Sequence, residues 1–244
     1  MKIGIIVAMD KEFCALEQLL SNKTEVQILG NHCTSGTLAG NEILLMHSGI
    51  GKVNAAIGAT NLINEFKPDV VVSSGCAGGA DVNLEIGDVV VSSSCQYHDV
   101  YCGPENLAGQ IQGMPSEFVT PQALVDKALS INNSSSMGSS PLLVEGPGEV
   151  GGHVVAGKIA TGDWFVDSVE KMAAIHATVP DAKAVDMESC AIAHACYIYN
   201  VQFVSFRVVS DIPLKENNTA SYKDFWATMA DKSFTTTKAF LEKL

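Results

Sequence analysis

Arginine is almost absent from the 244-residue chain: Arg207 is the only one, and the other fourteen basic residues are lysines. Any mechanism that needs an arginine clamp therefore has a single candidate. Positive charge is scarce as a whole, with 15 Lys and Arg against 27 Asp and Glu, for a net charge of −12. Such a field repels nucleic-acid backbones and anionic membrane surfaces, so we expect neither as a partner.

The chain also lacks long hydrophobic runs and paired cysteine motifs. The first apolar run, residues 3–9, meets Asp10, Lys11 and Glu12 and is too short to span a membrane. The seven cysteines are an odd number and include no CxxC pair, in a chain too large to need disulfides for its stability. These features predict a reducing, cytoplasmic setting.

Several binding motifs are missing, or their letters occur without the structural context that the motif needs. There is no GxSxG and no GxxxxGK[ST] phosphate loop, and the GxGxxG string at residues 146–151 runs into a strand-like segment instead of the helix that a dinucleotide site needs. Cys95, His98 and Cys102 lie close in sequence, as do Cys190 and His194, but neither spacing matches a common metal site and the second pair lies in a small, apolar packing segment. We therefore expect no metal and no cofactor.

What the chain does have is enough apolar sequence for a large core, 47% hydrophobic against 17% charged residues. Short β-rich runs alternate with helical patterns, which predicts one α/β domain over residues 1–244, with a central mixed, mostly parallel, twisted sheet flanked by helices on both sides. The polar segment 131–140 is expected to be a surface loop. The predicted strands are 3–8, 43–46, 70–73, 89–92, 153–159 and 203–209, with a further short strand ending near residue 186, and the predicted helices are 11–20, 52–66, 122–130, 167–177, 187–199 and 222–243.

Acidic side chains gather where predicted strands end, the place at which open α/β sheets bind ligands. Glu12 follows the first strand, Asp211 ends the last strand just after Arg207, and Glu188 stands where a short strand turns into a helix. Each has an ordinary explanation, because acids in a first helical turn complement the helix dipole and Asp is common in turns. Their coincidence with the lone arginine and with glycines at 75, 78 and 79 instead indicates a ligand site.

At these residues the sequence resembles the purine nucleoside phosphorylase-like superfamily and, more narrowly, its 5'-methylthioadenosine/S-adenosylhomocysteine nucleosidases. The resemblance covers nearly the whole chain, in order. Its blocks are MKIGIIVAMDKE (1–12), SGIGKVNAAIGAT (48–60), KPDVVVSSGCAGG (67–79), GDVVVS (87–92), YHD (97–99), TGDWFV (161–166), VDMESCAIAH (185–194) and RVVSD (207–211).

The resemblance implies hydrolysis of the N-glycosidic bond of 5'-methylthioadenosine and S-adenosylhomocysteine, which releases adenine and a 5-thio-substituted ribose and serves methionine salvage and removal of a methyl-cycle by-product. It assigns Asp211 to protonate the purine N7, Glu188 to bind the ribose hydroxyls and Glu12 to activate water. These roles suit the chemistry, since cleavage builds positive charge on the ribosyl ring and negative charge on the departing base.

Other positions carry over as substrate-binding residues. Phe165 would stack on the base, the Val166 backbone would bond its edge, Met187 would lie beside the sugar and Arg207 would order the carboxylates. The remaining positions of the implied site are Met9, Ile50, Cys76, Ala77, Gly78 and Ser210, together with Tyr222 and Phe225 in a segment that closes over the site.

Two departures from the family pattern limit what is carried over. The usual serine of the SAGG motif is Cys76 here, which puts a hydroxyl hydrogen bond from that position in doubt. Residues 101–114 match poorly, and in the family this region lends a wall of the 5' pocket across a homodimer interface. We expect a homodimer but assign no residue of that segment.

Three alternatives remain open on the same fold. A phosphorylase would bind phosphate largely through arginines, whereas this chain has none before position 207 and places Glu12 near the nucleophile pocket. A non-catalytic binding relative would be expected to lose the general acid, yet all three carboxylates are present. A hydrolase of futalosine-type nucleosides would share the same machinery.

Overall fold

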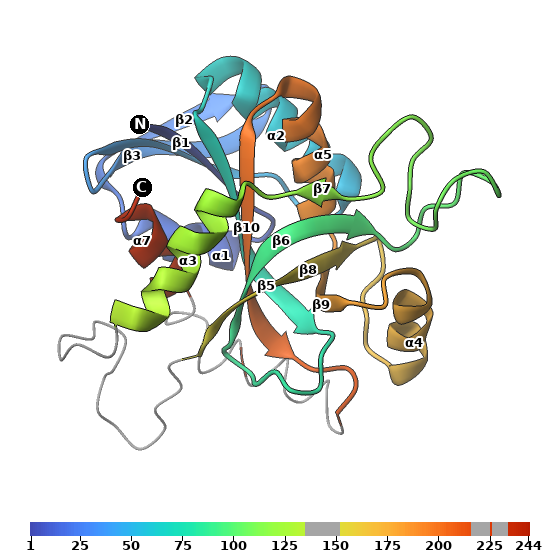
Figure 1. Cartoon of the computed structure of the whole chain (residues 1–244). Helices are drawn as coiled ribbons and strands as arrows, with labels where there is room; N and C mark the ends of the chain where they lie inside the picture. Colours follow the sequence, from blue (N-terminus) through green and yellow to red (C-terminus); the bar gives the residue numbers. More distant parts are fainter. Residues whose placement is uncertain (135–151, 216–224, 226–233) are drawn as a thin grey trace.

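The computed structural model describes residues 1–134, 152–215, 225 and 234–244. Helices and strands alternate along the chain (Figure 1). The strands are β1 (Lys2–Val7), β2 (Ser21–Ile28), β3 (Asn31–Leu38), β4 (Asn41–His47), β5 (Val70–Gly79), β6 (Val89–Tyr97), β7 (Phe118–Val119), β8 (Val154–Thr161), β9 (Ala182–Asp186) and β10 (Gln202–Asp211). The helices are α1 (Asp10–Glu17), α2 (Lys52–Phe66), α3 (Gln122–Ser134), α4 (Val169–Thr178), α5 (Ser189–Tyr199) and α7 (Thr235–Leu241).

The sheet is mixed, and its longest pairings are parallel. Strand β5 is its centre, because it pairs in parallel with β1 on one side and with β10 on the other. From β1 the sheet continues through β4, β3 and β2, while β10 leads through β6, β8 and β9 back to the end of β5 at Gly78 and Gly79. The second group of strands therefore closes on itself, and the carboxyl ends of β1, β5 and β10 are brought to the same region.

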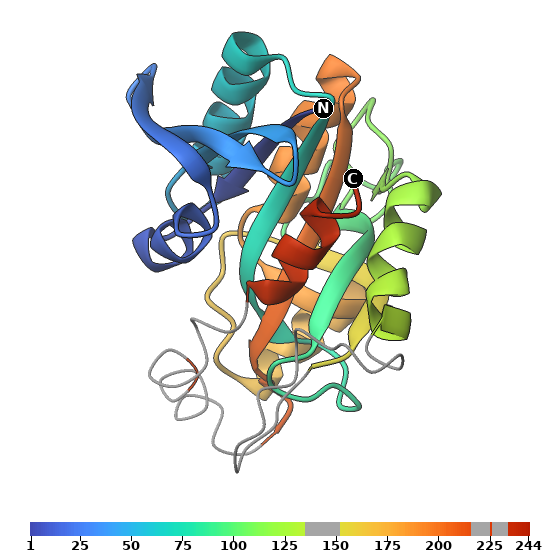
Figure 2. The same cartoon turned by 90° about the vertical axis from the view of Figure 1, so that its left-hand side faces the viewer.

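Helices cover the sheet on both sides, as the two views show (Figures 1 and 2). Alternate residues of a strand point to opposite faces, so Ile3 and Ile5 of β1 pack into the cluster that contains residues of α1, α3 and α7, whereas Ile6 packs with α2 and α5. Strands that are buried on both faces need apolar residues at successive positions, which explains their nearly continuous Ile and Val runs. A third cluster joins α4 to β8 and β9.

The predicted α/β architecture is confirmed, and the local differences have physical reasons. The hairpin β2–β3 was not predicted because β2 is polar and mostly exposed, so it carries no apolar pattern. The predicted strand 70–73 was too short: β5 runs on to Gly79 because β10 pairs with it as far as Gly78 and β9 pairs with Gly78 and Gly79. The predicted loop 131–140 was wrong for residues 131–134, which extend α3, and the rest of that loop lies outside the described residues. Of the predicted helix 222–243, the structure describes Phe225 and α7 within residues 234–244.

Candidate active site

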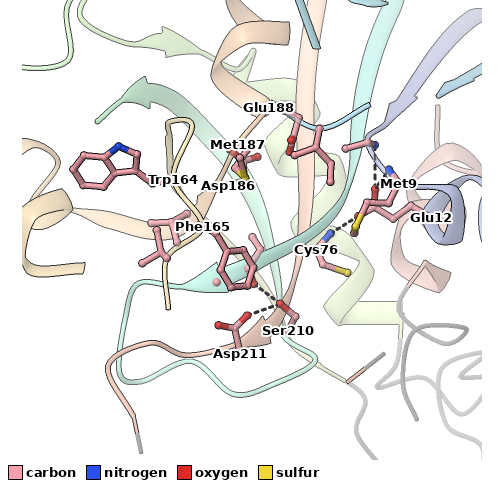
Figure 3. Close-up of a pocket in the computed structure, with 16 residues that line it drawn as sticks. Met9, Glu12, Cys76, Trp164, Phe165, Asp186, Met187, Glu188, Ser210 and Asp211 are labelled. Carbon is pink, nitrogen blue, oxygen red and sulfur yellow. Dashed lines mark hydrogen bonds between the residues drawn. The ribbon is translucent and has the colours of Figure 1, made fainter. Parts of the chain in front are cut away.

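One pocket lies where β1, β5 and β10 end, and most of the predicted site residues line it (Figure 3). Three carboxylates reach it from three separate elements: Glu12 from α1, Glu188 from the start of α5 and Asp211 from the end of β10. The other predicted residues in its wall are Met9, Ile50, Cys76, Ala77, Gly78, Phe165, Val166, Met187 and Ser210. The sequence reasoning had not assigned its remaining lining residues, Ala8, Trp164, Val185 and Asp186.

Glu12 is held by backbone donors from two segments. Its Oε2 accepts the N–H groups of Ala8 and Met9, each at 3.1 Å, and its Oε1 accepts the N–H of Cys76 at 3.0 Å. The side chain is only 3% exposed, and this burial raises the pKa of Glu12 against the lowering effects of Arg207 and of these three hydrogen bonds. The carboxylate is thus fixed in position and easier to protonate than an ordinary glutamate, as a base that must take up a proton requires.

Gly75 makes room for this carboxylate. A Cβ at this position would lie 2.7 Å from Oε1 of Glu12 and 3.1 Å from Nη1 of Arg207. The first separation is shorter than such contacts tolerate, so a side chain at position 75 would displace Glu12 or the strand. The sequence signal for this close approach is the glycine-rich end of β5.

Arg207 lies behind the pocket and is not among the residues that line it. Its Nε donates to Oδ2 of Asp186 at 2.6 Å and its Nη2 donates to the hydroxyl of Ser73 at 2.9 Å. Asp186 also accepts the hydroxyl of Thr161 at 2.6 Å and the N–H of Ser189. The buried guanidinium is therefore fixed by Asp186, an acid with no predicted role, and its charge acts on the nearby carboxylates from outside the pocket lining.

Glu188 is the N-cap of α5, which begins at Ser189. The predicted helix 187–199 included Glu188 as its second residue, and the structure corrects this position. Its backbone φ of −133° and ψ of −39° are not helical, while its carbonyl oxygen accepts the N–H groups of Ala191 and Ile192 in the first turn of the helix. The side chain turns toward the pocket, where its Oε1 accepts the N–H of Gly51 at 2.8 Å. Burial raises the pKa of Glu188 to about 7, aided by the negative charge of Asp186 and opposed by Arg207 and by the Gly51 hydrogen bond.

Asp211 is directed by an irregularity in β10. The pairing of β10 with β5 slips between Val209 and Asp211, so Ser210 is an extra residue in the strand. Such a bulge changes the direction of neighbouring side chains. The Ser210 hydroxyl lies 2.6 Å from Oδ1 of Asp211 and 3.2 Å from the Ala77 carbonyl oxygen, so both residues of the bulge are tied to the pocket wall.

Apolar side chains form the rest of the wall. Phe165 and Trp164 are 57% and 42% exposed, which is unusual for aromatic rings and leaves their faces accessible at the pocket. Trp164 packs edge-on against the buried His98 ring, with centroids 5.2 Å apart. A flat, apolar ligand with polar edges would suit this wall together with the carboxylates.

Cys76 lines the pocket at the position where the resemblance implies a serine. Burial raises the pKa of its thiol well above the usual range, and the negative charge of Glu12 adds to this effect. A neutral thiol is a weak hydrogen-bond donor and a poor nucleophile. The geometry gives Cys76 a place in the wall, with its backbone N–H as the polar group that contacts Glu12.

Two predicted site residues, Tyr222 and Phe225, are not among the described residues that line the pocket. Phe225 is buried in the core cluster on the face of α1 and α7 and does not appear in the pocket lining, and Tyr222 lies outside the described residues. Within the described part of the chain, no group of three or more His, Cys, Asp or Glu side chains is arranged to hold a metal ion. In the same residues, no helix is long and apolar enough to cross a membrane.

Comparison with known proteins decides the family. Residues 2–242 match the sequence profile of the Phosphorylase superfamily. The chain belongs to this superfamily. It is 39% identical over 237 residues to a 5'-methylthioadenosine/S-adenosylhomocysteine nucleosidase of Lysinibacillus sphaericus, covering 96% of this chain and 95% of that protein.

Solved structures give the same grouping within the superfamily. The nucleosidase of Neisseria meningitidis in complex with methylthio-immucillin-A has a TM-score of 0.88 and 32% identity, over 100% of this chain and 99% of that one. The nucleosidase of Colwellia psychrerythraea in complex with adenine has a TM-score of 0.87 and 34% identity, over 100% and 96%. The futalosine hydrolase of Helicobacter pylori is also similar, with a TM-score of 0.86 and 28% identity over 100% and 98%.

Proposed function

We propose that the protein hydrolyses the N-glycosidic bond of 5'-methylthioadenosine and S-adenosylhomocysteine and releases adenine. The observation that carries this proposal is the convergence of Glu12, Glu188 and Asp211 on one pocket whose described lining holds no lysine or arginine side chain. The named relatives support the substrate, since the closely similar structures hold a methylthio analogue or adenine. The proposal extends to the route in which such a hydrolase acts, methionine salvage and removal of a methyl-cycle by-product.

In this proposal the three carboxylates divide the reaction between them. Asp211, with the Ser210 hydroxyl bonded to its Oδ1, donates a proton to N7 of the leaving purine. Glu188 accepts hydrogen bonds from the ribose hydroxyls and, when ionised, opposes the growing ribosyl cation. Glu12 orients and deprotonates the water that attacks C1'. Arg207 acts from behind by neutralising part of the charge that these acids concentrate.

The apolar wall positions the two halves of the substrate. Phe165 stacks on the base and the Val166 backbone bonds its edge, while Met9, Ile50 and Met187 line the sugar and the 5' substituent. Residues 76–78 bring the backbone of β5 against the ligand. The closing segment expected at Tyr222 and Phe225 is left out of the proposal, because Phe225 is buried in the core and Tyr222 lies outside the described residues.

Water is a better nucleophile here than phosphate. A phosphate dianion beside the buried Glu12 would need compensating cations, and the one arginine is committed to Asp186 and Ser73. Hydrolysis of futalosine-type nucleosides is the second candidate, because the chain is also similar to the Helicobacter pylori futalosine hydrolase. The sequence identity to that enzyme is lower than the identity to the Lysinibacillus sphaericus nucleosidase. The presence of the proposed acid Asp211, the proposed base Glu12 and the sugar-facing Glu188 argues against a role limited to binding.

We also propose a homodimer in the cytoplasm, in which the neighbouring chain completes the 5' pocket. Exposed apolar side chains support the dimer, because Val53 and Ile57 lie one helical turn apart on α2, directly after the pocket residue Ile50. All seven cysteines are free, which supports a reducing compartment.

Release of adenine from 5'-methylthioadenosine in phosphate-free buffer tests the function. We expect full activity without phosphate, no effect of arsenate, and free 5-methylthioribose as the sugar product. The 1-phosphate sugar as main product, or a requirement for phosphate, would overturn the hydrolase proposal. Comparison of kcat/KM for 5'-methylthioadenosine and futalosine separates the two hydrolase candidates.

A further inference from the structure

The loop that reaches Glu188 is held by a cluster of charged groups outside the pocket. Gly51, whose N–H bonds Glu188, is the N-cap of α2, and Lys52 is the first residue of that helix. The Lys52 N–H donates to Oδ1 of Asp163 at 2.9 Å. Asp163 lies in the loop between β8 and α4, so one end of α2 is capped by a carboxylate from a distant part of the chain.

A second acid fixes this cap. Both carboxylate oxygens of Asp99 accept the Lys52 ammonium, at 2.8 and 2.6 Å, and Oδ2 also accepts the N–H of Asp163 at 2.9 Å. The Lys52 and Asp99 side chains are only 24% and 11% exposed. Burial raises the pKa of Asp99, but its hydrogen bonds to Lys52 and Asp163 outweigh this and hold the pKa below the usual value, so the acid is an anion at neutral pH. Asp99, Lys52 and Asp163 form a closed set of contacts that we name the loop clamp.

Gly51 fits the loop clamp closely. Its φ of +95° is a conformation that side-chain-bearing residues rarely adopt, and a Cβ there would lie 3.1 Å from Oδ1 of Asp163. The glycine is thus set between the carboxylate that caps its helix and the carboxylate that its N–H contacts. The direction of that N–H depends on where the start of α2 is held.

We propose that Asp163 is a positioning residue, which caps α2 from the neighbouring loop and thereby keeps the Gly51 N–H on the carboxylate of Glu188. The role in catalysis rests on the proposed function, in which Glu188 faces the sugar as an anion. A donor that contacts the charged form of an acid lowers its pKa, so the loop clamp favours the ionised form of Glu188.

The other charged groups around Glu188 define what the test must separate. Asp186 of β9 and Glu12 of α1 raise its pKa by their negative charge, and Arg207 of β10 lowers it. Removing the negative charge of Asp163 would by itself lower the pKa of Glu188. Loss of the Gly51 contact would raise it, so charge and positioning act in opposite directions.

A matched pair of variants isolates positioning. Asp163→Asn and Asp163→Ala remove the same charge, but only asparagine keeps an oxygen that accepts the Lys52 N–H and remains a good helix cap. The pKa of Glu188 is measured by carbon-13 NMR of the intact protein labelled at glutamate side-chain carboxyls, with the signal assigned from Glu188→Gln. We expect the Glu188 pKa in Asp163→Ala to exceed that in Asp163→Asn by about one pH unit, since a hydrogen bond to a charged group contributes that order of free energy.

The kinetic readout should follow the same order. In Asp163→Ala the acidic limb of kcat should move to higher pH, with the loss at neutral pH mainly in kcat, and Asp163→Asn should restore most of the rate. Should the Asp163→Ala variant fold poorly, Asp99→Ala and Asp99→Asn provide a second matched pair. Both remove the same charge, but only asparagine keeps an oxygen that can accept the Asp163 N–H of the loop clamp. Asp81→Ala controls for the loss of stability that removing a paired aspartate causes. Asp81 is also paired with a lysine and accepts a backbone N–H, but it lies away from the pocket.

The outcomes distinguish the two proposals. Equal Glu188 pKa values in Asp163→Asn and Asp163→Ala, or in Asp99→Asn and Asp99→Ala, would overturn the positioning role whatever the activities are. A pKa difference without any change in hydrolysis would leave the loop clamp as a structural fact and refute the proposed catalytic role of the Glu188 anion.

Discussion

Replacing Glu188 with glutamine should damage the activity and stabilise the fold, and the second effect should depend on pH. Glu188 is 8% exposed, and burial raises its pKa from the ordinary value of 4.5 to about 7. A carboxyl group whose pKa is raised on folding contributes stability below its unfolded value, and that contribution is lost as pH rises through the folded value. At alkaline pH the native state therefore holds an anion that the unfolded chain would solvate better. Glutamine keeps the shape and can still accept the Gly51 N–H, but it carries no charge.

The magnitude follows from the two pKa values. One pH unit corresponds to about 1.4 kcal/mol, so the penalty is about 1 kcal/mol at pH 5 and approaches about 3 kcal/mol at pH 8. The free energy of unfolding of Glu188→Gln should thus exceed that of the parent protein by more at pH 8 than at pH 5, by up to about 2 kcal/mol. The rate of hydrolysis should fall far more than substrate binding weakens, because the lost charge acts on the transition state.

Urea unfolding at the two pH values, together with kcat and KM for adenine release, measures both effects. Glu117→Gln is the control of opposite sign, since its hydrogen bond from Lys158 lowers the pKa of Glu117. Stability from that group is present above its unfolded pKa and is lost as pH falls through the folded value, so this variant should be less stable than the parent at pH 8. Our reasoning about Glu188 would be refuted by a glutamine variant that is no more stabilised at pH 8 than at pH 5.

Three further substitutions test other parts of the pocket. Asp211→Asn should slow release of adenine by about 10² to 10⁴ but spare a 5-methylthioribosyl nitrophenolate, whose leaving group needs no proton; equal losses on both substrates would mean that Asp211 only organises the pocket. Gly75→Ala should lower kcat by about 10²-fold, because its Cβ would displace Glu12, and a circular-dichroism melting curve should show that the fold survives; unchanged kcat would contradict the close approach at Oε1. Cys76→Ser should keep near-parental kcat/KM, since the backbone N–H at this position makes the contact with Glu12, and a collapse of activity without unfolding would reveal a role for the thiol.

The three carboxylates that the sequence singled out line one pocket because each stands at an element boundary that the backbone pattern reveals. Glu12 follows a continuous apolar strand, and Asp211 ends another, so the rule that ligands bind at carboxyl ends of strands was sufficient to place them together. The bulge at Ser210 had no such signal, because it arises from the register between β10 and β5, two strands far apart in the chain. The aim of Asp211 therefore required the structure.

Contacts behind the pocket were harder to predict for the same reason. Asp186 lies next to residues that the resemblance singled out, yet its bond to Arg207 joins β9 to β10 and is visible only when the sheet is assembled. The cap of α2 by Asp163 crosses more than a hundred residues of sequence. The hairpin β2–β3 was missed on different grounds. Strand β2 is mostly polar and exposed, and it joins the sheet by pairing with β3, which pairs with β4.

The distribution of charge in the pocket connects the fold to the choice of nucleophile. Four buried acids line it, and only one of them, Asp186, is paired with the single arginine, so the described pocket carries an excess of negative groups. An anionic nucleophile would add to this excess, whereas water is neutral and adds no charge. The same excess favours a transition state in which the sugar becomes positive. The features that make this site costly to fold, buried carboxylates with raised pKa values, are thus the ones that select hydrolysis over phosphorolysis.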